Sequence, residues 1–179
     1  MKNISFKGIE RAWPDLPHYS SVSFSESFGV SVDLAPVLRR LDIRLEDAIL
    51  DIGAFKNETV ESLQEQGFYN AVGLDVNHQI LSSKFGRQGN FRDISTDEKY
   101  KVIYFSQFID HLPGGNFNTG MKPKLTLFAM KIWHNLLPGG YLIFSERANN
   151  VPELVKALLR TGFILISSEK GLYIFKKGE

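Results

Sequence analysis

Apolar and polar positions follow two different periods along most of the chain. Apolar residues at helical spacing predict helices over residues 32–41, 57–66, 125–136 and 152–162, with a shorter helix over 78–84. Short apolar runs bounded by turn-forming residues predict strands over residues 48–52, 69–76, 90–94, 100–105, 141–145, 163–167 and 172–176. The two kinds of element alternate from about Val32 onward, whereas the periodicity is weak before it.

Local signals mark where several of these elements begin and end. Asn57 can cap the helix that follows it, and Gly67 can end that helix. The Pro-Gly-Gly run at 138–140 ends the next long helix, and Pro152 suits the first turn of the last one. Because only a few residues, including Gly171, separate the final two strands, these strands should form an antiparallel hairpin.

The order of the elements predicts an α/β fold. Strands that alternate with helices build a mostly parallel sheet with helices on both faces, here closed by the antiparallel C-terminal hairpin. Ligands of such sheets bind beyond the carboxyl ends of the strands, so the residues that directly follow each strand are the candidates for function. We expect a single domain over residues 1–179, with a core over 32–179 and an aromatic-rich extension or lid over 1–31.

Composition and charge narrow the class of protein. The 179 residues are 43% hydrophobic and 23% charged, as is ordinary for a globular domain, and the formal net charge of +1 gives no reason to expect a nucleic-acid partner. Without cysteine there are no disulfides, thiolate metal sites or cysteine nucleophile. No secretory signal and no apolar run near the roughly 20 residues of a membrane span is present, so we expect a cytoplasmic protein without a membrane partner.

Five short motifs stand in order along the chain, within or just after predicted strands. They are Ile49–Gly53, Gly73–Asp75, Asn90–Ile94, Val102–Leu112 and Leu136–Phe144. Together they resemble the motifs of the class I S-adenosylmethionine-dependent methyltransferases. The resemblance covers residues 32–179 and implies a three-layer Rossmann-like fold with a seven-stranded sheet in the order 3-2-1-4-5-7-6. It also implies S-adenosylmethionine as cofactor and direct methyl transfer to a small molecule or peptide, with S-adenosylhomocysteine as product.

The resemblance assigns cofactor roles to residues at the strand ends. Asp75 would accept hydrogen bonds from the ribose hydroxyls. Gly53 would let the backbone turn sharply beside the ligand, and Asp51 would either support this loop or reach the ligand's amino group. Asp93 would accept from the adenine amino group or, alternatively, cap local structure. The remaining implied cofactor contacts come from Ala54, Phe55, Val76, the backbone of Ile94, Ser106 and Gln107.

The glycine loop departs from the family pattern at two positions. Methyltransferases usually carry glycine two and four residues after the first, where this chain has Phe55 and Asn57. Asn57 is accounted for by its suitability as a helix N-cap. Glycine at the position of Phe55 commonly makes room for the methionine part of the cofactor, so the phenyl ring must point away, reshape the loop or fill the space.

Candidate substrate and catalytic residues lie after the fourth predicted strand and before the core. By resemblance, Phe108 lies between cofactor and substrate. Tyr19 and Phe28 could pack on an apolar or planar substrate, or simply close the core. His111 could act as a general base because the unperturbed pKa of histidine lies near neutrality, and local packing is its alternative role. The histidines do not have metal-ligand spacing, so no metal is expected.

Two other functions remain open. A protein that kept the fold but lost the cofactor loop would be an inactive methyltransferase-like binding or partner protein, and Phe55 is the main support for this hypothesis. A nicotinamide-dependent oxidoreductase would need Gly-x-Gly-x-x-Gly after the first strand. The actual run, Gly53–Glu58, lacks that pattern.

Overall fold

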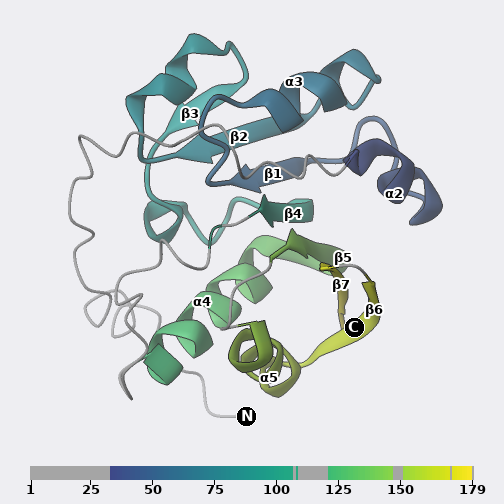
Figure 1. Cartoon of the computed structure of the whole chain (residues 1–179), viewed down its shortest axis with the longest axis vertical. Coiled ribbons are helices and arrows are strands. Elements are labelled where there is room, and N and C mark those ends of the chain that lie inside the picture. Colours follow the sequence, from purple (N-terminus) through teal and green to yellow (C-terminus); the bar gives the residue numbers. More distant parts are fainter. Residues whose placement is uncertain (1–32, 107, 109–120, 147–150, 170, 179) are drawn as a thin grey trace.

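The structure of the chain is a computed structural model (Figure 1), and it describes residues 33–106, 108, 121–146, 151–169 and 171–178. The predicted extension over 1–31 lies outside the described residues. So do four predicted site residues: Tyr19, Phe28, Gln107 and His111.

Strands and helices follow one another in the predicted order. The strands are β1 (Ile49–Ile52), β2 (Ala71–Asp75), β3 (Gly86–Gln88), β4 (Tyr100–Ser106), β5 (Leu136–Ser145), β6 (Phe163–Glu169) and β7 (Leu172–Lys177). The helices are α2 (Leu34–Arg40), α3 (Glu58–Glu65), α4 (Met121–Asn135) and α5 (Val151–Thr161), with 3₁₀ turns η1 (His78–Ser82) and η2 (Phe91–Asp93). No helix in the described part of the chain is long and apolar enough to cross a membrane.

The seven described strands form one sheet in the order β3-β2-β1-β4-β5-β7-β6. The strands from β3 to β5 are parallel to one another, and β7 runs antiparallel to both β5 and β6. In Figure 1, α2 and α3 lie on one side of the sheet and α4 and α5 on the other. The predicted three-layer arrangement, strand order and terminal hairpin are therefore confirmed.

Each face of the sheet has its own hydrophobic core. All four residues of β1 are buried, as expected for a central parallel strand that helices cover on both faces. On the face of α4 and α5, Phe128 and Leu158 pack in one cluster with Phe105. On the opposite face, Leu38 of α2 and Leu63 of α3 belong to a second cluster. The helices thus use the apolar stripes that predicted them.

The third strand is not where the sequence predicted it. It is β3, which lies before the predicted range 90–94, and that range holds the turn η2 instead. The side-chain oxygen of Asn90 accepts a hydrogen bond from the Arg92 amide at 3.1 Å, a local bond that competes with strand pairing. Glycine at position 86 permits the observed strand, since a Cβ there would lie 1.9 Å from the carbonyl oxygen of Ile80.

The fifth strand begins earlier than predicted. It starts at Leu136 and not at Tyr141, so the Pro-Gly-Gly run at 138–140 lies within the strand and does not connect the helix to it. Leu136 pairs with Tyr100, and the register shifts before Tyr141 pairs with Val102. The Pro-Gly-Gly residues therefore lie within a continuous strand, where they accompany the shift in register.

The two edges of the sheet differ in polarity. The short strand β3 carries Arg87, whose guanidinium makes two hydrogen bonds to the Glu98 carboxylate at 2.7 and 3.2 Å. On the outermost strand β6, the exposed fractions of Ile164, Leu165 and Ile166 are 54%, 39% and 50%. The β6 edge is thus apolar where the β3 edge is charged, and exposed apolar edges favour association with other chains.

Candidate functional site

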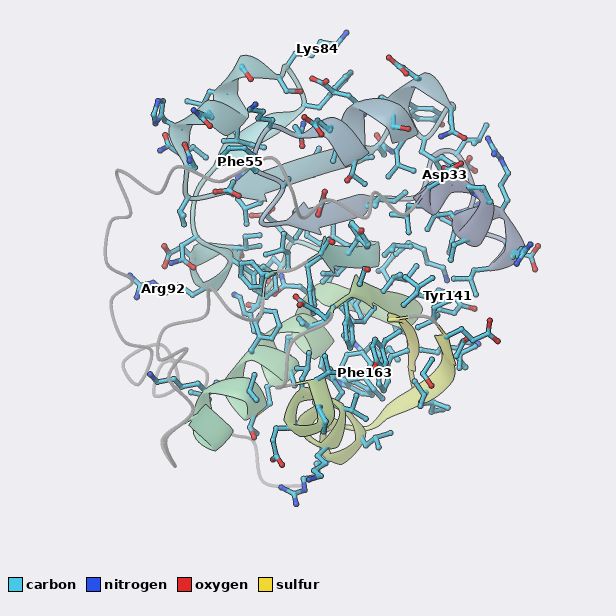
Figure 2. All side chains as sticks on the ribbon, in the orientation of Figure 1. Asp33, Phe55, Lys84, Arg92, Tyr141 and Phe163 are labelled. Atoms are coloured by element: carbon cyan, nitrogen blue, oxygen red, sulfur yellow. The ribbon has the colours of Figure 1, made fainter. Side chains whose placement is uncertain are left out.

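The carboxyl ends of the parallel strands lie on one side of the sheet. Figure 2 shows Phe55 and Arg92 on that side, at the left of the view, and Asp33 and Tyr141 on the opposite side. Because β1 pairs with both β2 and β4, the ends of these three strands are neighbours. The described residues that directly follow β1 and β2 therefore gather around the end of β1.

The loop that follows β1 is hydrogen-bonded to β2. The amides of Gly53 and Ala54 both donate to the carbonyl oxygen of Leu74, at 2.8 and 3.3 Å. The Phe55 amide donates to Asp75 Oδ2 at 2.9 Å. These bonds fix the loop to the end of β2.

The backbone of this loop has the left-handed conformation at three alternate positions. The φ angles are +76° at Gly53, +47° at Phe55 and +69° at Asn57. These are the positions at which the family pattern has glycine. A non-glycine residue pays about 1–2 kcal/mol for this conformation, with asparagine the best tolerated. The loop therefore has, at all three positions, a backbone that glycine adopts without strain, although two of the three positions carry a side chain.

The interpretation of Asn57 as a helix cap is wrong. Asn57 does occupy the N-cap position of α3, but its side chain makes no capping hydrogen bond. A capping side chain reaches the first helical amides from an extended backbone, and the positive φ of Asn57 directs it elsewhere. Its buried Nδ2 donates instead to Ser83 Oγ at 3.0 Å.

The Asp75 carboxylate is partly used by the protein itself. Its Oδ2 accepts from Phe55, and its Oδ1 accepts from the Asn77 amide at 2.7 Å. A carboxylate has about four lone-pair sites, so each oxygen can accept one more hydrogen bond. The two hydroxyls of a ribose need two acceptors, and the half-buried Asp75 fits that requirement.

Asp51 lies deeper in the same region. Only 4% of the residue is exposed, and burial raises the pKa of its carboxyl well above the usual value, with the Asp75 charge adding to the effect. Tyr104 is its partner in the register of β4, and burial followed by the Asp51 charge raises the pKa of that phenol as well. The Asp51 carboxyl therefore keeps its proton to a higher pH than an exposed aspartate does.

Phe108 lies against the first glycine of the loop. A Cβ at Gly53 would lie 2.7 Å from Phe108 Cδ2, so glycine there makes room for this ring as well as for the turn. The ring centroid is 5.9 Å from that of Phe105 and 5.7 Å from that of Phe128. The predicted substrate residue thus joins the loop to the core beneath α4.

Three predicted cofactor contacts lie in different surroundings. Val76 follows Asp75 directly and is 54% exposed. Asp93 is exposed in η2, where its Oδ1 lies 3.2 Å from Arg92 Nε. The Ile94 side chain is buried in the core, and its amide lies 3.4 Å from the Phe91 carbonyl oxygen. The side chains of Val76 and Asp93 are therefore exposed, whereas the Ile94 side chain is buried and its amide already donates to Phe91.

Ser106 ends β4, and its hydroxyl makes a hydrogen bond with Tyr104 that opposes the rise in the phenol pKa.

No group of three or more His, Cys, Asp or Glu side chains that could hold a metal ion occurs among the residues that the structure describes.

Tyr104, Ser83 and Gly73 are site residues that the sequence did not predict. Strand register places Tyr104 beside Asp51, and register has no signature in the chain itself. The contact of Ser83 depends on the fold in the same way. Gly73 could have been found, because a glycine inside a predicted strand signals the close approach of another group.

Comparison with known proteins gives matches only among solved structures. No protein-family model and no curated protein matches the sequence. An S-adenosylmethionine-dependent methyltransferase from Methanosarcina mazei is 16% identical with a TM-score of 0.62, over 82% of this chain and 99% of that one. A TehB-like methyltransferase from Corynebacterium glutamicum is 16% identical with a TM-score of 0.63, over 84% and 90%. One from Mesorhizobium loti is 13% identical with a TM-score of 0.60, over 82% and 99%.

The chain has the class I methyltransferase fold. Within this methyltransferase fold, β1 is the strand at which the order reverses, with β2 on one side and β4 on the other. Ligands of open α/β sheets bind at such a switch point. The loop 53–57, Asp75 and Phe108 all surround it.

Proposed function

We propose that this protein is an S-adenosylmethionine-dependent methyltransferase that acts on a small molecule or peptide by direct methyl transfer. The observation that carries the proposal is the positive φ at residues 53, 55 and 57, although two of the three are not glycine. Strained backbone is kept where the surrounding structure and function require it. A loop that had lost its ligand would have no reason to keep a conformation unfavourable to phenylalanine.

The residues around the end of β1 would hold the cofactor. Asp75 would accept the ribose hydroxyls on its remaining lone pairs, and the exposed side chains of Val76 and Asp93 would flank the adenine. The buried carboxyl of Asp51, whose pKa is raised by burial, would bind at the amino-acid end. These roles follow the family resemblance and agree with the exposure and bonding of the side chains.

The chemistry needs little from the chain beyond placement. When bound, S-adenosylmethionine supplies a methyl group that a nucleophile can displace from sulfur. The protein aligns the acceptor and excludes water, and a base removes a proton where the acceptor needs it. Phe108 is placed to form an apolar wall of the site, and His111 remains the candidate base. A cytoplasmic location and the absence of nucleic-acid and membrane partners remain predictions.

One observation favours the inactive binding protein as a second candidate. The Phe108 ring lies directly on Gly53, and Phe55 adds a second half-buried ring to the same loop. Two aromatic rings beside the loop could take the room that the methionine part of the cofactor needs. The protein would then bind a partner through this fold and would not catalyse methyl transfer.

Isothermal titration with S-adenosylhomocysteine separates the two functions. The unaltered protein should release or absorb heat on binding, and Asp75→Ala should weaken binding about 100-fold, because two charge-assisted hydrogen bonds are lost. Asp97→Ala, at an exposed aspartate outside the site, should bind as the unaltered protein does. The absence of heat for the unaltered protein at millimolar ligand would support the inactive partner protein instead.

A further inference from the structure

Asn57 occupies a buried slot between three segments. The residue is fully buried at 0% exposure, and its Nδ2 donates to Ser83 Oγ at 3.0 Å. Ser83 Oγ also accepts from the Phe85 amide at 3.3 Å, and the Phe85 carbonyl accepts from the Gly73 amide at 3.0 Å. The side chain therefore joins the loop after β1 to the segment between η1 and β3, and through it to β2.

Glycine at position 73 creates the slot. A Cβ at this position would lie 1.7 Å from Asn57 Oδ1 and 2.8 Å from its Cγ. The carboxamide fills the volume that any side chain at position 73 would need. The loop has asparagine at position 57, and the glycine that makes room for this side chain is Gly73 on the neighbouring strand β2.

The slot holds Asn57 at a cost in free energy. Its Oδ1 is buried and has no hydrogen-bond partner, and its backbone has a positive φ. A buried acceptor without a partner destabilises the folded state, and so does the left-handed backbone at a residue other than glycine. A purely structural residue at this position would be expected to avoid both costs, whereas a residue that sets the path of a functional loop retains them.

We infer that Asn57 is a positioning residue for the cofactor loop, locked between Ser83 and Gly73 in place of the loop's missing glycine. The lock fixes the end of the loop, where the Asn57 amide donates to the Ala54 carbonyl at 2.6 Å. With both ends fixed, the Phe55 amide is held on Asp75 Oδ2. Asn57 thus orients the Asp75 carboxylate for a nucleoside without touching it. This inference rests on the proposed function.

The test measures the loop and the ligand separately. Hydrogen exchange of the Phe55 amide in the free protein reports the bond to Asp75, and calorimetry reports the dissociation constant for S-adenosylhomocysteine. Asn57→Ala and Ser83→Ala should each speed exchange of that amide about tenfold or more and weaken binding about tenfold. The matched control is Asn70→Ala. The Nδ2 of Asn70 donates to the Glu46 carbonyl oxygen at a distance of 2.6 Å, and neither residue belongs to the loop. This variant should change neither quantity, whatever its effect on the unfolding midpoint.

Asn57→Gly separates the side chain from the backbone. It allows the positive φ without strain but removes the lock, so exchange should stay fast and binding weak. Binding by Asn57→Gly equal to that of the unaltered protein would overturn the inference, and so would an unchanged Phe55 exchange rate in Asn57→Ala. If the unaltered protein does not bind S-adenosylhomocysteine, the proposed function fails, while the exchange measurement still decides whether Asn57 holds the loop.

Discussion

The two ends of the parallel strands carry polar side chains of opposite kinds. At the carboxyl ends, the acids Asp51 and Asp75 keep acceptor or donor capacity that the described contacts do not use up. At the amino ends, Lys99, Lys101 and Lys177 all donate to backbone carbonyl oxygens. The acids at the carboxyl ends are therefore suited to bind a ligand, whereas the lysines at the amino ends already donate to backbone carbonyl oxygens of the protein.

The lysines act mainly on the end of α4. Lys177 Nζ donates to the carbonyls of Trp133 and Leu136 at 2.7 and 2.8 Å, and Lys99 Nζ donates to that of His134 at 2.6 Å. The last carbonyls of a helix lack partners within the helix, and cations there also interact favourably with the helix dipole. This contrast predicts that substitutions at the two ends change different properties of the protein.

The largest effect is expected at Asp51. Asp51→Asn should raise the free energy of unfolding at pH 8 by about 1–3 kcal/mol, because it removes a buried carboxyl that resists ionisation, and it should weaken binding of S-adenosylhomocysteine. The folded protein holds the Asp51 proton more tightly than the unfolded chain, so this stability is lost as the pH rises from 3.8 through the higher folded pKa.

Urea unfolding at pH 3 and pH 8 checks the Asp51 prediction. The two proteins should converge at the lower pH, and Asp97→Asn, at an exposed carboxyl, should show little change at either. An Asp51→Asn variant that is less stable than the unaltered protein at pH 8 would contradict the cost assigned to burying this carboxyl.

The next largest effect is expected at Lys177. Lys177→Met keeps the length of the side chain but loses two hydrogen bonds to carbonyls, so the free energy of unfolding should fall by about 1–2 kcal/mol. Binding of S-adenosylhomocysteine should be unchanged, because the amino ends of the strands lie away from the loop. Lys156→Met, which breaks only an exposed pair with Glu153, should cost less than about 0.5 kcal/mol. A loss of binding in Lys177→Met would show that the two ends are coupled.

The backbone at Phe55 should give a smaller effect. Phe55→Gly should be about 1 kcal/mol more stable than Phe55→Ala, because alanine retains the cost of the positive φ and glycine does not. Chemical denaturation of both variants measures the difference. At Lys84, which lacks a positive φ, alanine should be no less stable than glycine, and the same order at both positions would contradict the strain assigned to the loop.

The smallest effect is expected at His134, among the lysines. Burial, with the charges of Lys177, Lys99 and Lys131, lowers the pKa of its imidazole. The unfolded chain then binds this proton more readily, so stability falls as the pH drops below about 6.5. His134→Gln should flatten the dependence of the unfolding midpoint on pH between 5 and 7, and an unchanged slope would assign it to another group.

The fold could be predicted almost entirely from the sequence. Periodicity and turn residues predicted most of the strands and helices, and the family resemblance carried by five ordered motifs implied the strand order of the sheet. The third strand was placed wrongly because only Phe91 and Ile94 are apolar in residues 90–94, and the local hydrogen bond of Asn90 favours a turn there. The start of the fifth strand was missed because a Pro-Gly-Gly run normally ends pairing and here remains within the strand.

The candidate site could be predicted only in part. Asp51 and Asp75 were found because they stand at fixed places in strands. The buried contact of Asn57 with Ser83 was not predicted, since this contact and helix capping suit the same residue type and differ in φ. Tyr104 pairs with Asp51, and Ser83 bonds to Asn57, which lies 26 residues before it. Hydrophobic periodicity does not predict contacts between residues so far apart along the chain.

The slot at Gly73 also predicts how relatives of this chain should vary. The volume available there is shared by positions 57 and 73, so one of the two must stay small while the other carries a side chain. Where evolution restored glycine at 57, position 73 would be released from its strictest steric constraint. Where asparagine remains, even an alanine at 73 would collide with the carboxamide. Substitutions at the two positions should therefore be epistatic, and they should covary among homologous sequences.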